Sequence, residues 1–214
     1  MESKVISLQT SKGGGGKTTG AITIAGILIK MGKRCALIDM DDDKSDLYKW
    51  AIQSELLSEH VYQFSSPHYK EFCSFISNLK DSYEYIIIDT PPRPTSISPY
   101  SHIFALKQSN LALISVFGGK MEENEYYKVR DICDMESIPY RILFSRWNES
   151  YKMNQLVKDN LKNEPKLVSS INQSIKYVEA EAYGVHILES KISMDEEQQL
   201  YGLAREIIST LEEI

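Results

Sequence analysis

Five short apolar runs, separated by helical stretches, constrain the fold of this chain most strongly. The runs are Val5–Leu8, Cys35–Ile38, Tyr85–Ile88, Leu111–Val116 and Arg141–Phe144. They lack the alternation of apolar and polar residues that marks a strand with one solvated face. Strands buried on both faces and separated by helices form a mostly parallel sheet with helices on both sides. The sequence therefore predicts a doubly wound α/β fold, in which ligands bind beyond the carboxyl ends of the strands.

Composition limits the domain count and the class of partner. The chain has 214 residues, of which 42% are hydrophobic and 25% charged, so we expect a single globular domain over residues 1–214. Its formal net charge of −6 excludes general electrostatic attraction to nucleic acid or anionic lipid, so such contacts would need a local basic patch. The longest apolar stretch, residues 21–29, is too short to span a bilayer. With no secretory leader and three scattered cysteines, we expect a cytoplasmic protein with reduced thiols.

A glycine-rich loop directly after the first apolar run carries the strongest chemical signal. It reads Ser11-Lys12-Gly13-Gly14-Gly15-Gly16-Lys17-Thr18-Thr19 and opens a predicted helix over residues 18–31. Consecutive glycines let backbone N–H groups surround a phosphate, and the helix N-terminus adds a positive dipole. Lys17 can reach the β- and γ-phosphates, and the Thr18 hydroxyl can ligate Mg²⁺. The loop predicts a nucleoside triphosphate site.

Two further apolar runs end in carboxylates. The run 36–38 is followed by Asp39 and Asp41, and Tyr85–Ile88 is followed by Asp89. If Asp39 and Asp41 both lie on the strand, their side chains point the same way. One could then orient Mg²⁺-bound water while the other positions the attacking water. Asp42 and Asp43 are expected to form a solvated turn, because four aspartates cannot all face a triphosphate.

The string K-G-G-x-G-K-T-T resembles the deviant Walker A motif of the ParA/MinD family of ATPases. The resemblance implies a P-loop NTPase fold, ATP and Mg²⁺ as cofactors, and ATP hydrolysis. Lys12 occupies the place of the signature lysine, which in the family reaches the partner's ATP in a sandwich homodimer. The candidate sites are catalytic Lys12, Lys17 and Asp41, nucleotide-binding Lys12, Gly13, Gly14, Gly15, Gly16, Lys17, Thr18 and Thr19, and metal-binding Thr18, Asp39 and Asp89.

Two other segments extend the resemblance and limit it. Residues 85–92, ending Asp-Thr-Pro-Pro, look like the family's Walker B strand, with Asp89 holding a water of the Mg²⁺ shell. Asp41 matches the family residue associated with hydrolysis, but Asp42 and Asp43 replace the family's Pro-Gln. The resemblance is specific over residues 4–47 and 81–92, and only architectural elsewhere.

Among ParA-like proteins, the sequence is most similar to the small plasmid partition ATPases. Residues 192–214 carry one basic and six acidic residues, unlike the basic membrane-binding helix of MinD-type members. Because the loop lies near Met1, we expect no N-terminal helix-turn-helix domain of the kind that the large partition class carries. The resemblance implies ATP-dependent binding to nonspecific DNA, hence nucleoid association, and a ParB-like centromere-binding adaptor. Residues 146–176, with six basic and three acidic residues, are the candidate DNA patch.

An alternative function remains open at the level of sequence. The same switch could serve a positioning or recruitment ATPase for a protein cargo, such as a conjugation relaxosome, a carboxysome or a chemoreceptor array. A metabolic ATP-dependent ligase or reductase is disfavoured, because the four histidines are scattered and no substrate-side catalytic group stands out.

Overall fold

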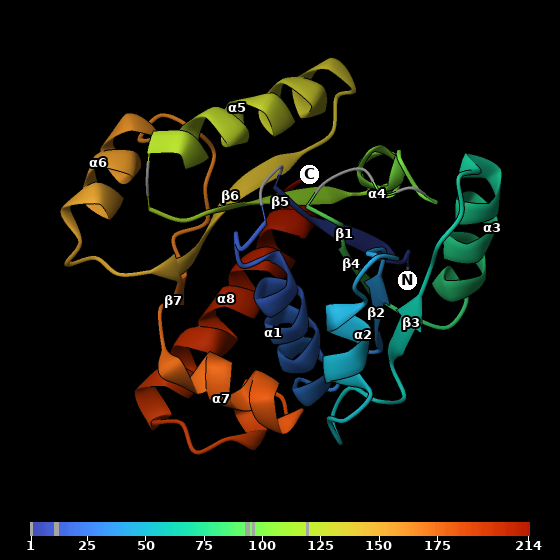
Figure 1. The fold of residues 1–214 in the computed structure, drawn as a ribbon, viewed down its shortest axis with the longest axis horizontal. Helices are drawn as coiled ribbons and strands as arrows, with labels where there is room; N and C mark the ends of the chain where they lie inside the picture. The colour runs from blue at the N-terminus through green and yellow to red at the C-terminus, as the bar shows by residue number, and fades with distance from the viewer. Residues whose placement is uncertain (1, 11–12, 93–94, 96, 119) are drawn as a thin grey trace.

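The computed structural model describes residues 2–10, 13–92, 95, 97–118 and 120–214, and it has a seven-stranded sheet with helices on both faces (Figure 1). The sheet order is β3-β2-β4-β1-β5-β6-β7, and every strand pairing is parallel. The strands are β1 (Lys4–Gln9), β2 (Cys35–Asp39), β3 (Val61–Gln63), β4 (Tyr85–Asp89), β5 (Leu111–Val116), β6 (Tyr140–Trp147) and β7 (Ile171–Asn172). The predicted α/β fold is confirmed.

The helices follow the strands in nearly regular alternation. They are α1 (Lys17–Lys30), α2 (Asp46–Ala51), α3 (Tyr69–Lys80), α4 (Ser101–Gln108), α5 (Lys120–Met135), α6 (Lys152–Asn160), α7 (Ile175–Tyr183), the 3₁₀ helix η1 (Ile187–Glu189) and α8 (Met194–Glu213). Helices α1, α2, α7 and α8 pack on one face of the sheet, and α3, α4 and α5 cover the other (Figure 1). No helix in the described part of the chain is both long and apolar enough to cross a lipid bilayer.

The central strands have apolar residues on both faces because each face has its own core. In β4, Ile87 packs with α1 and α8, whereas Ile86 and Ile88 pack with α3 and α4. In β5, Leu113 belongs to the first core, and Ile114 packs with α5 and α6. This arrangement explains why the five runs show no polar alternation.

The termini of two helices are fixed by local sequence. The Ser193 hydroxyl accepts a hydrogen bond from the Glu196 N–H at 3.2 Å, and the Glu196 carboxylate accepts from the Ser193 N–H at 2.8 Å. This reciprocal capping box starts α8. Gly32, with φ 78°, follows α1 and permits the left-handed conformation that ends it.

Candidate functional site

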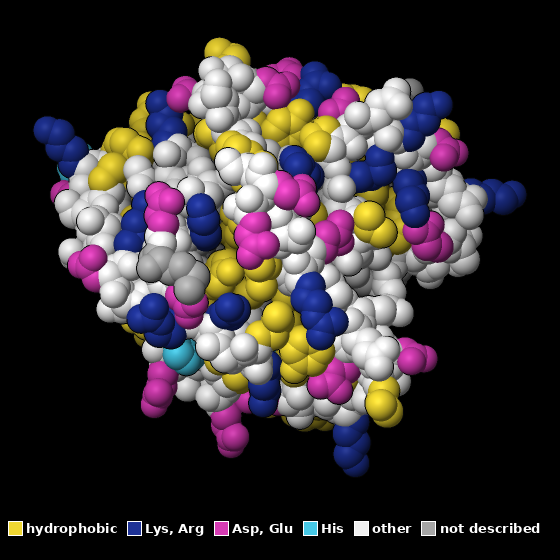
Figure 2. Space-filling view, turned by 180° about the vertical axis from the view of Figure 1, so that it is seen from behind, with side chains coloured by type: hydrophobic (Ala, Val, Ile, Leu, Met, Phe, Trp, Pro, Cys, Tyr) yellow, Lys and Arg dark blue, Asp and Glu magenta, His cyan; other side chains and the backbone are white. Residues whose placement is uncertain are grey.

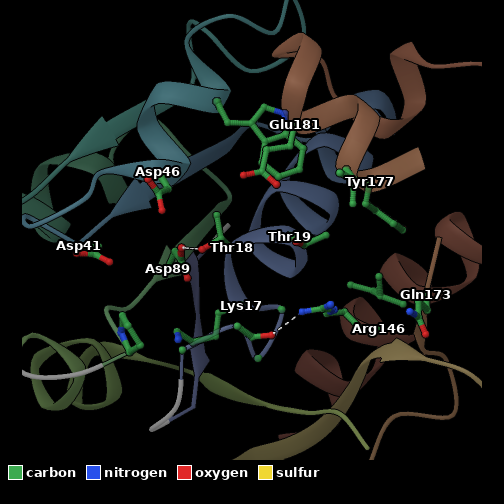
Figure 3. Close-up of a pocket in the computed structure, with 18 of the residues that line it drawn as sticks. Lys17, Thr18, Thr19, Asp41, Asp46, Asp89, Arg146, Gln173, Tyr177 and Glu181 are labelled. Atoms are coloured by element: carbon green, nitrogen blue, oxygen red, sulfur yellow. Dashed lines mark hydrogen bonds between the residues drawn. The ribbon is translucent and has the colours of Figure 1, made fainter. Parts of the chain in front are cut away.

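A cavity of about 530 Å³ opens at the carboxyl edge of the sheet, beside the loop that joins β1 to α1. Glycines 13–16 and the first turn of α1, with Lys17, Thr18 and Thr19, line one side of it (Figure 3). The structure therefore brings the predicted phosphate-binding residues to a single cavity. Ser11 and Lys12 lie outside the described residues, so the predicted role of Lys12 across a dimer interface remains a prediction.

The loop requires glycine at specific positions. Gly14 and Gly16 have φ values of 78° and 77°, in the left-handed region that side chains disfavour. A Cβ atom added to Gly16 would lie 2.9 Å from Ser145 Cβ. Gly16 is also the N-cap of α1. The absence of a side chain at Gly16 therefore lets the N-terminus of α1 pack closely against Ser145 of β6.

Thr18 and Asp89 form the pair at the centre of the site. Thr18 Oγ1 donates a hydrogen bond to Asp89 Oδ2 at 2.6 Å. Asp89 is buried, and its other oxygen, Oδ1, has no hydrogen-bond partner among the described residues. Burial raises the pKa of Asp89 to about 7, although Lys17 and the Thr18 hydroxyl oppose the shift. Burial likewise lowers the pKa of Lys17, against the negative charges of Asp89 and Asp41.

This donor set fits Mg²⁺ bound together with phosphate oxygens. Among the described residues, no group of three or more His, Cys, Asp or Glu side chains is gathered to hold a metal alone. Mg²⁺ commonly keeps several waters and takes one or two protein oxygens plus substrate phosphates. Thr18 and Asp89 both line the cavity, where Thr18 supplies a hydroxyl and Asp89 a carboxylate whose buried Oδ1 has no partner among the described residues.

Both carboxylate oxygens of Asp39 accept hydrogen bonds from backbone N–H groups. Its Oδ1 accepts from the Asp41 N–H and its Oδ2 accepts from the Tyr48 N–H, both at 2.9 Å. Burial raises its pKa to about 6, and Asp39 is not among the described residues that line the cavity. Both oxygens thus order the segment between β2 and α2. The metal-binding role of Asp39 stays a prediction.

Asp41 lies at the cavity, but in the turn after β2 and not on the strand itself. Strand β2 ends at Asp39, so Asp41 lies beyond the strand and the alternation rule does not apply to the pair. Asp41 lines the cavity, and its Oδ1 accepts from the Asp43 and Lys44 N–H groups at 3.2 and 3.3 Å. Asp43 is exposed, as expected for a solvated turn. Asp42 instead is half-buried and accepts from the Ser65 hydroxyl at 2.8 Å.

The opposite wall of the cavity comes from segments without a recognisable motif. It includes Lys44, Asp46 and Trp50 around α2, and Gln173, Ser174, Ile175, Tyr177, Val178 and Glu181 around α7 (Figure 3). The Trp50 indole N–H donates to the Val185 carbonyl at 2.8 Å, which ties the two segments together. Arg146 also lines the cavity, whereas Asn148 orders its own turn by accepting from the Ser150 N–H and hydroxyl.

Comparisons with known proteins agree with this geometry. Residues 3–71 match the family model described as "AAA domain". The MinC:MinD cell division complex of Aquifex aeolicus contains a chain with a TM-score of 0.79 at 19% identity, covering 97% of this chain and 96% of that one. A putative plasmid partition protein from Borrelia burgdorferi B31, bound to AMPPNP, gives a TM-score of 0.73 at 16% identity, covering 98% and 100%.

A third similar structure was solved with a nucleotide and Mg²⁺ bound. It is the septum site-determining protein MinD of Pyrococcus horikoshii complexed with Mg-ADP, with a TM-score of 0.73 at 17% identity and 96% of each chain covered. At identities below 20%, the TM-scores of these structures establish the fold alone, and the family model matches the segment that holds the glycine loop. The chain thus combines an AAA-domain match over residues 3–71 with the fold of the MinD- and ParA-type P-loop ATPases.

Proposed function

We propose that this chain is a Mg²⁺-dependent ATPase whose nucleotide occupies the cavity at the glycine loop. The observation that carries the proposal is the convergence of the loop, the α1 N-terminus and the Thr18–Asp89 pair on one cavity. Backbone N–H groups of the loop and the helix dipole favour a polyphosphate there. The resemblance to ATPases that bear the deviant Walker A motif supports ATP as the nucleotide.

Each residue then has a defined task in hydrolysis. Lys17 places its ammonium group against the phosphates, and Thr18 offers its hydroxyl to Mg²⁺. The bound metal would neutralise charge that develops on the phosphate oxygens. Asp89 would help to hold the hydrated metal, and Asp41 would orient the attacking water at the cavity edge. Its two backbone hydrogen bonds, from Asp43 and Lys44, hold the Asp41 carboxylate in place.

We further propose that ATP brings two copies of the chain together as a sandwich homodimer. The support is the resemblance at Lys12, which in the family contacts the nucleotide of the partner. The cavity is lined on its outer wall by half-exposed or exposed side chains of α7, including Ile175 and Val178. A second copy would cover these apolar groups and exclude water from the nucleotide.

As the output of this switch, we propose plasmid or DNA partition through nonspecific DNA and a ParB-like adaptor. The support is the resemblance to small partition ATPases and the likeness to the Borrelia partition protein. Of the basic residues in 146–176, several are engaged within the chain. Lys158 pairs with Glu149 at 2.5 Å, and Lys176 pairs with Glu196 at 2.6 Å. Lys152 and Lys162 have no ion pair within the described part of the chain.

The ion pairs of Lys158 and Lys176 within the chain favour the second candidate function, which is the positioning of a protein cargo. A surface that attracts phosphates needs several uncompensated cations. On the face shown in Figure 2, Lys and Arg side chains are interspersed with Asp and Glu side chains and with apolar groups. A surface of mixed charge suits a protein partner better than the phosphate backbone of DNA.

A DNA-binding titration separates the two candidates. Duplex DNA of unrelated sequence is titrated with the protein at low salt, without nucleotide and with ATP and Mg²⁺. Partition predicts binding that requires ATP and weakens steeply with salt, and a Lys152→Ala, Lys162→Ala double variant should bind more weakly than a Lys33→Ala, Lys80→Ala control. ATP hydrolysis without DNA binding supports the protein-cargo function. No ATP hydrolysis under any of these conditions contradicts the proposed enzyme.

A further inference from the structure

The glycine loop is held from behind by residues of β5 and β6. The Ser115 hydroxyl donates a hydrogen bond to the Gly15 carbonyl. At the preceding residue of the loop, the Gly14 carbonyl accepts a hydrogen bond from Arg146 Nη1 of β6 at 3.1 Å (Figure 3). Two consecutive carbonyls of the loop are therefore fixed by side chains that come from two different strands.

Fixing these carbonyls also fixes the N–H groups that face a phosphate. The described part of the chain has no cis peptide bond, and in a trans peptide the C=O of one residue and the N–H of the next point in opposite directions. The bond at the Gly14 carbonyl thus sets the direction of the Gly15 N–H. The bond at the Gly15 carbonyl sets that of the Gly16 N–H. Both Gly15 and Gly16 line the cavity.

Ser115 is an exception to the composition of its strand. It is buried at 2% exposure within β5, whose other members are Leu, Ala, Ile and Val. A buried hydroxyl is normally retained where it is hydrogen-bonded. Ser145, at 1% exposure on the neighbouring strand β6, has its Oγ 2.9 Å from Ser115 Oγ. Ser115 is the donor in this contact as well, so its single hydroxyl proton is shared between the Gly15 carbonyl and Ser145 Oγ.

Arg146 is placed for the same task by a local irregularity. Its φ of 51° lies in the left-handed region, which a residue with a long side chain rarely adopts. The pairing of β6 with β7 shifts register between Ser145 and Trp147, on either side of Arg146. The extra residue bends the strand and leaves Arg146 outside the regular strand pairing. The Arg146 guanidinium reaches the glycine loop from this position.

We propose that Ser115 and Arg146 are positioning residues, which hold the Gly15 and Gly14 carbonyls so that the following N–H groups are presented to the nucleotide phosphates. This inference rests on the proposed binding of ATP at the loop. It assigns a function to two residues outside the glycine loop and outside the carboxylates of β2 and β4.

The test is the affinity for AMPPNP with Mg²⁺, measured by isothermal titration calorimetry on the full chain. The matched control is Ser7→Ala, because Ser7 is a buried serine of β1 whose Oγ accepts a hydrogen bond from Ser109 Oγ at 2.8 Å. We expect Ser115→Ala to weaken AMPPNP binding about 10-fold, the loss of one well-placed hydrogen bond. Ser7→Ala should bind like the wild type. Ser115→Thr, which keeps the hydroxyl, should restore most of the affinity.

A second variant tests the inference independently of the core. Arg146→Asn shortens an exposed side chain and tolerates a positive φ, so the melting temperature without nucleotide should stay unchanged while AMPPNP binding weakens. Unchanged affinity in both Ser115→Ala and Arg146→Asn would overturn the inference, as would equal losses in Ser115→Ala and Ser7→Ala. Failure of the wild type to bind AMPPNP would instead refute the proposed function, and the inference with it.

Discussion

Thr18 donates a hydrogen bond of 2.6 Å to Asp89, which joins the first turn of α1 to the end of β4. The two residues are 71 positions apart in the sequence, and β1, which lies next to β4 in the sheet, carries the loop that brings them together. The Thr18 hydroxyl can turn to a metal, because the pair is at the cavity and Asp89 keeps a second oxygen free of partners among the described residues.

Replacing Thr18 by alanine should weaken the Mg²⁺ dependence of the site. We expect Thr18→Ala to need about 10- to 100-fold more Mg²⁺ for half-maximal ATP hydrolysis, because a group that supports the metal is lost. Thr18→Ser keeps the hydroxyl and serves as the control. The measurement is the ATPase rate as a function of Mg²⁺ at saturating ATP. A Thr18→Ala profile equal to that of Thr18→Ser would remove Thr18 from the metal site.

Asp41 is expected to act in hydrolysis rather than in binding. Asp41→Ala should lower the ATPase rate about 10²-fold, the contribution of a well-placed group that handles water, while AMPPNP affinity stays within about 3-fold of the wild type. Single-turnover kinetics and calorimetry measure the two quantities separately. Asp43→Ala, at an exposed position of the same turn, is the matched control. If Asp43→Ala loses as much activity as Asp41→Ala, the effect belongs to the turn and not to the carboxylate.

Lys12 is expected to act across a dimer interface. In an Asp41→Ala background, which keeps ATP intact, the protein should sediment as a dimer with ATP and Mg²⁺, and further substitution Lys12→Ala should leave it monomeric. Lys80→Ala removes an exposed lysine at the end of α3 and should leave the dimer unchanged. An ATP-dependent dimer that persists without the Lys12 ammonium group would refute the cross-interface role.

His186 should make the fold sensitive to acid. The side chain is fully buried, its Nδ1 accepts from the Leu188 N–H at 3.1 Å, and burial lowers its pKa to about 4. Because the unfolded chain binds this proton near pH 6.5, the contribution of the neutral imidazole is complete above that pH and is lost as the pH falls towards 4. The loss at pH 4 should be about 3 kcal/mol.

The variant His186→Asn isolates this contribution, since asparagine can cap the same N–H but does not titrate. The difference in unfolding free energy between wild type and variant, from urea denaturation, should shrink by about 3 kcal/mol from pH 7 to pH 4. Asp39 and Asp89, whose pKa values are raised, favour the folded state at low pH, but they are present in both proteins and cancel. A difference that does not change with pH would show that His186 does not control acid stability.

The sequence predicted the central strands because their burial leaves a direct signature. Strands β3 and β7 were not predicted, because they have three and two residues and depend on their neighbours. Ile171 of β7, for example, pairs with Ser145 beside the register shift in β6. Short edge strands carry too few residues for a periodic pattern, so their position follows from tertiary packing.

The site divides in the same way. The glycine loop, Lys17, Thr18 and Asp89 could be identified from the sequence, because each directly follows or ends an apolar run that forms a strand. The two strands, β1 and β4, are neighbours in the sheet. The sequence did not indicate that β2 ends at Asp39, whose carboxylate accepts a hydrogen bond from the Asp41 N–H. Tyr177 and Glu181 were missed, because only the packing of α7 brings them to the cavity. No local motif marks such residues.

Calorimetric titration of AMPPNP with Mg²⁺ into wild type and Lys17→Ala measures whether the glycine loop binds a magnesium-complexed nucleoside triphosphate. We expect one AMPPNP per chain in the wild type and binding about 10²-fold weaker in Lys17→Ala, because a charged phosphate contact is lost. Absence of binding in the wild type, or equal affinity in the two proteins, would contradict it.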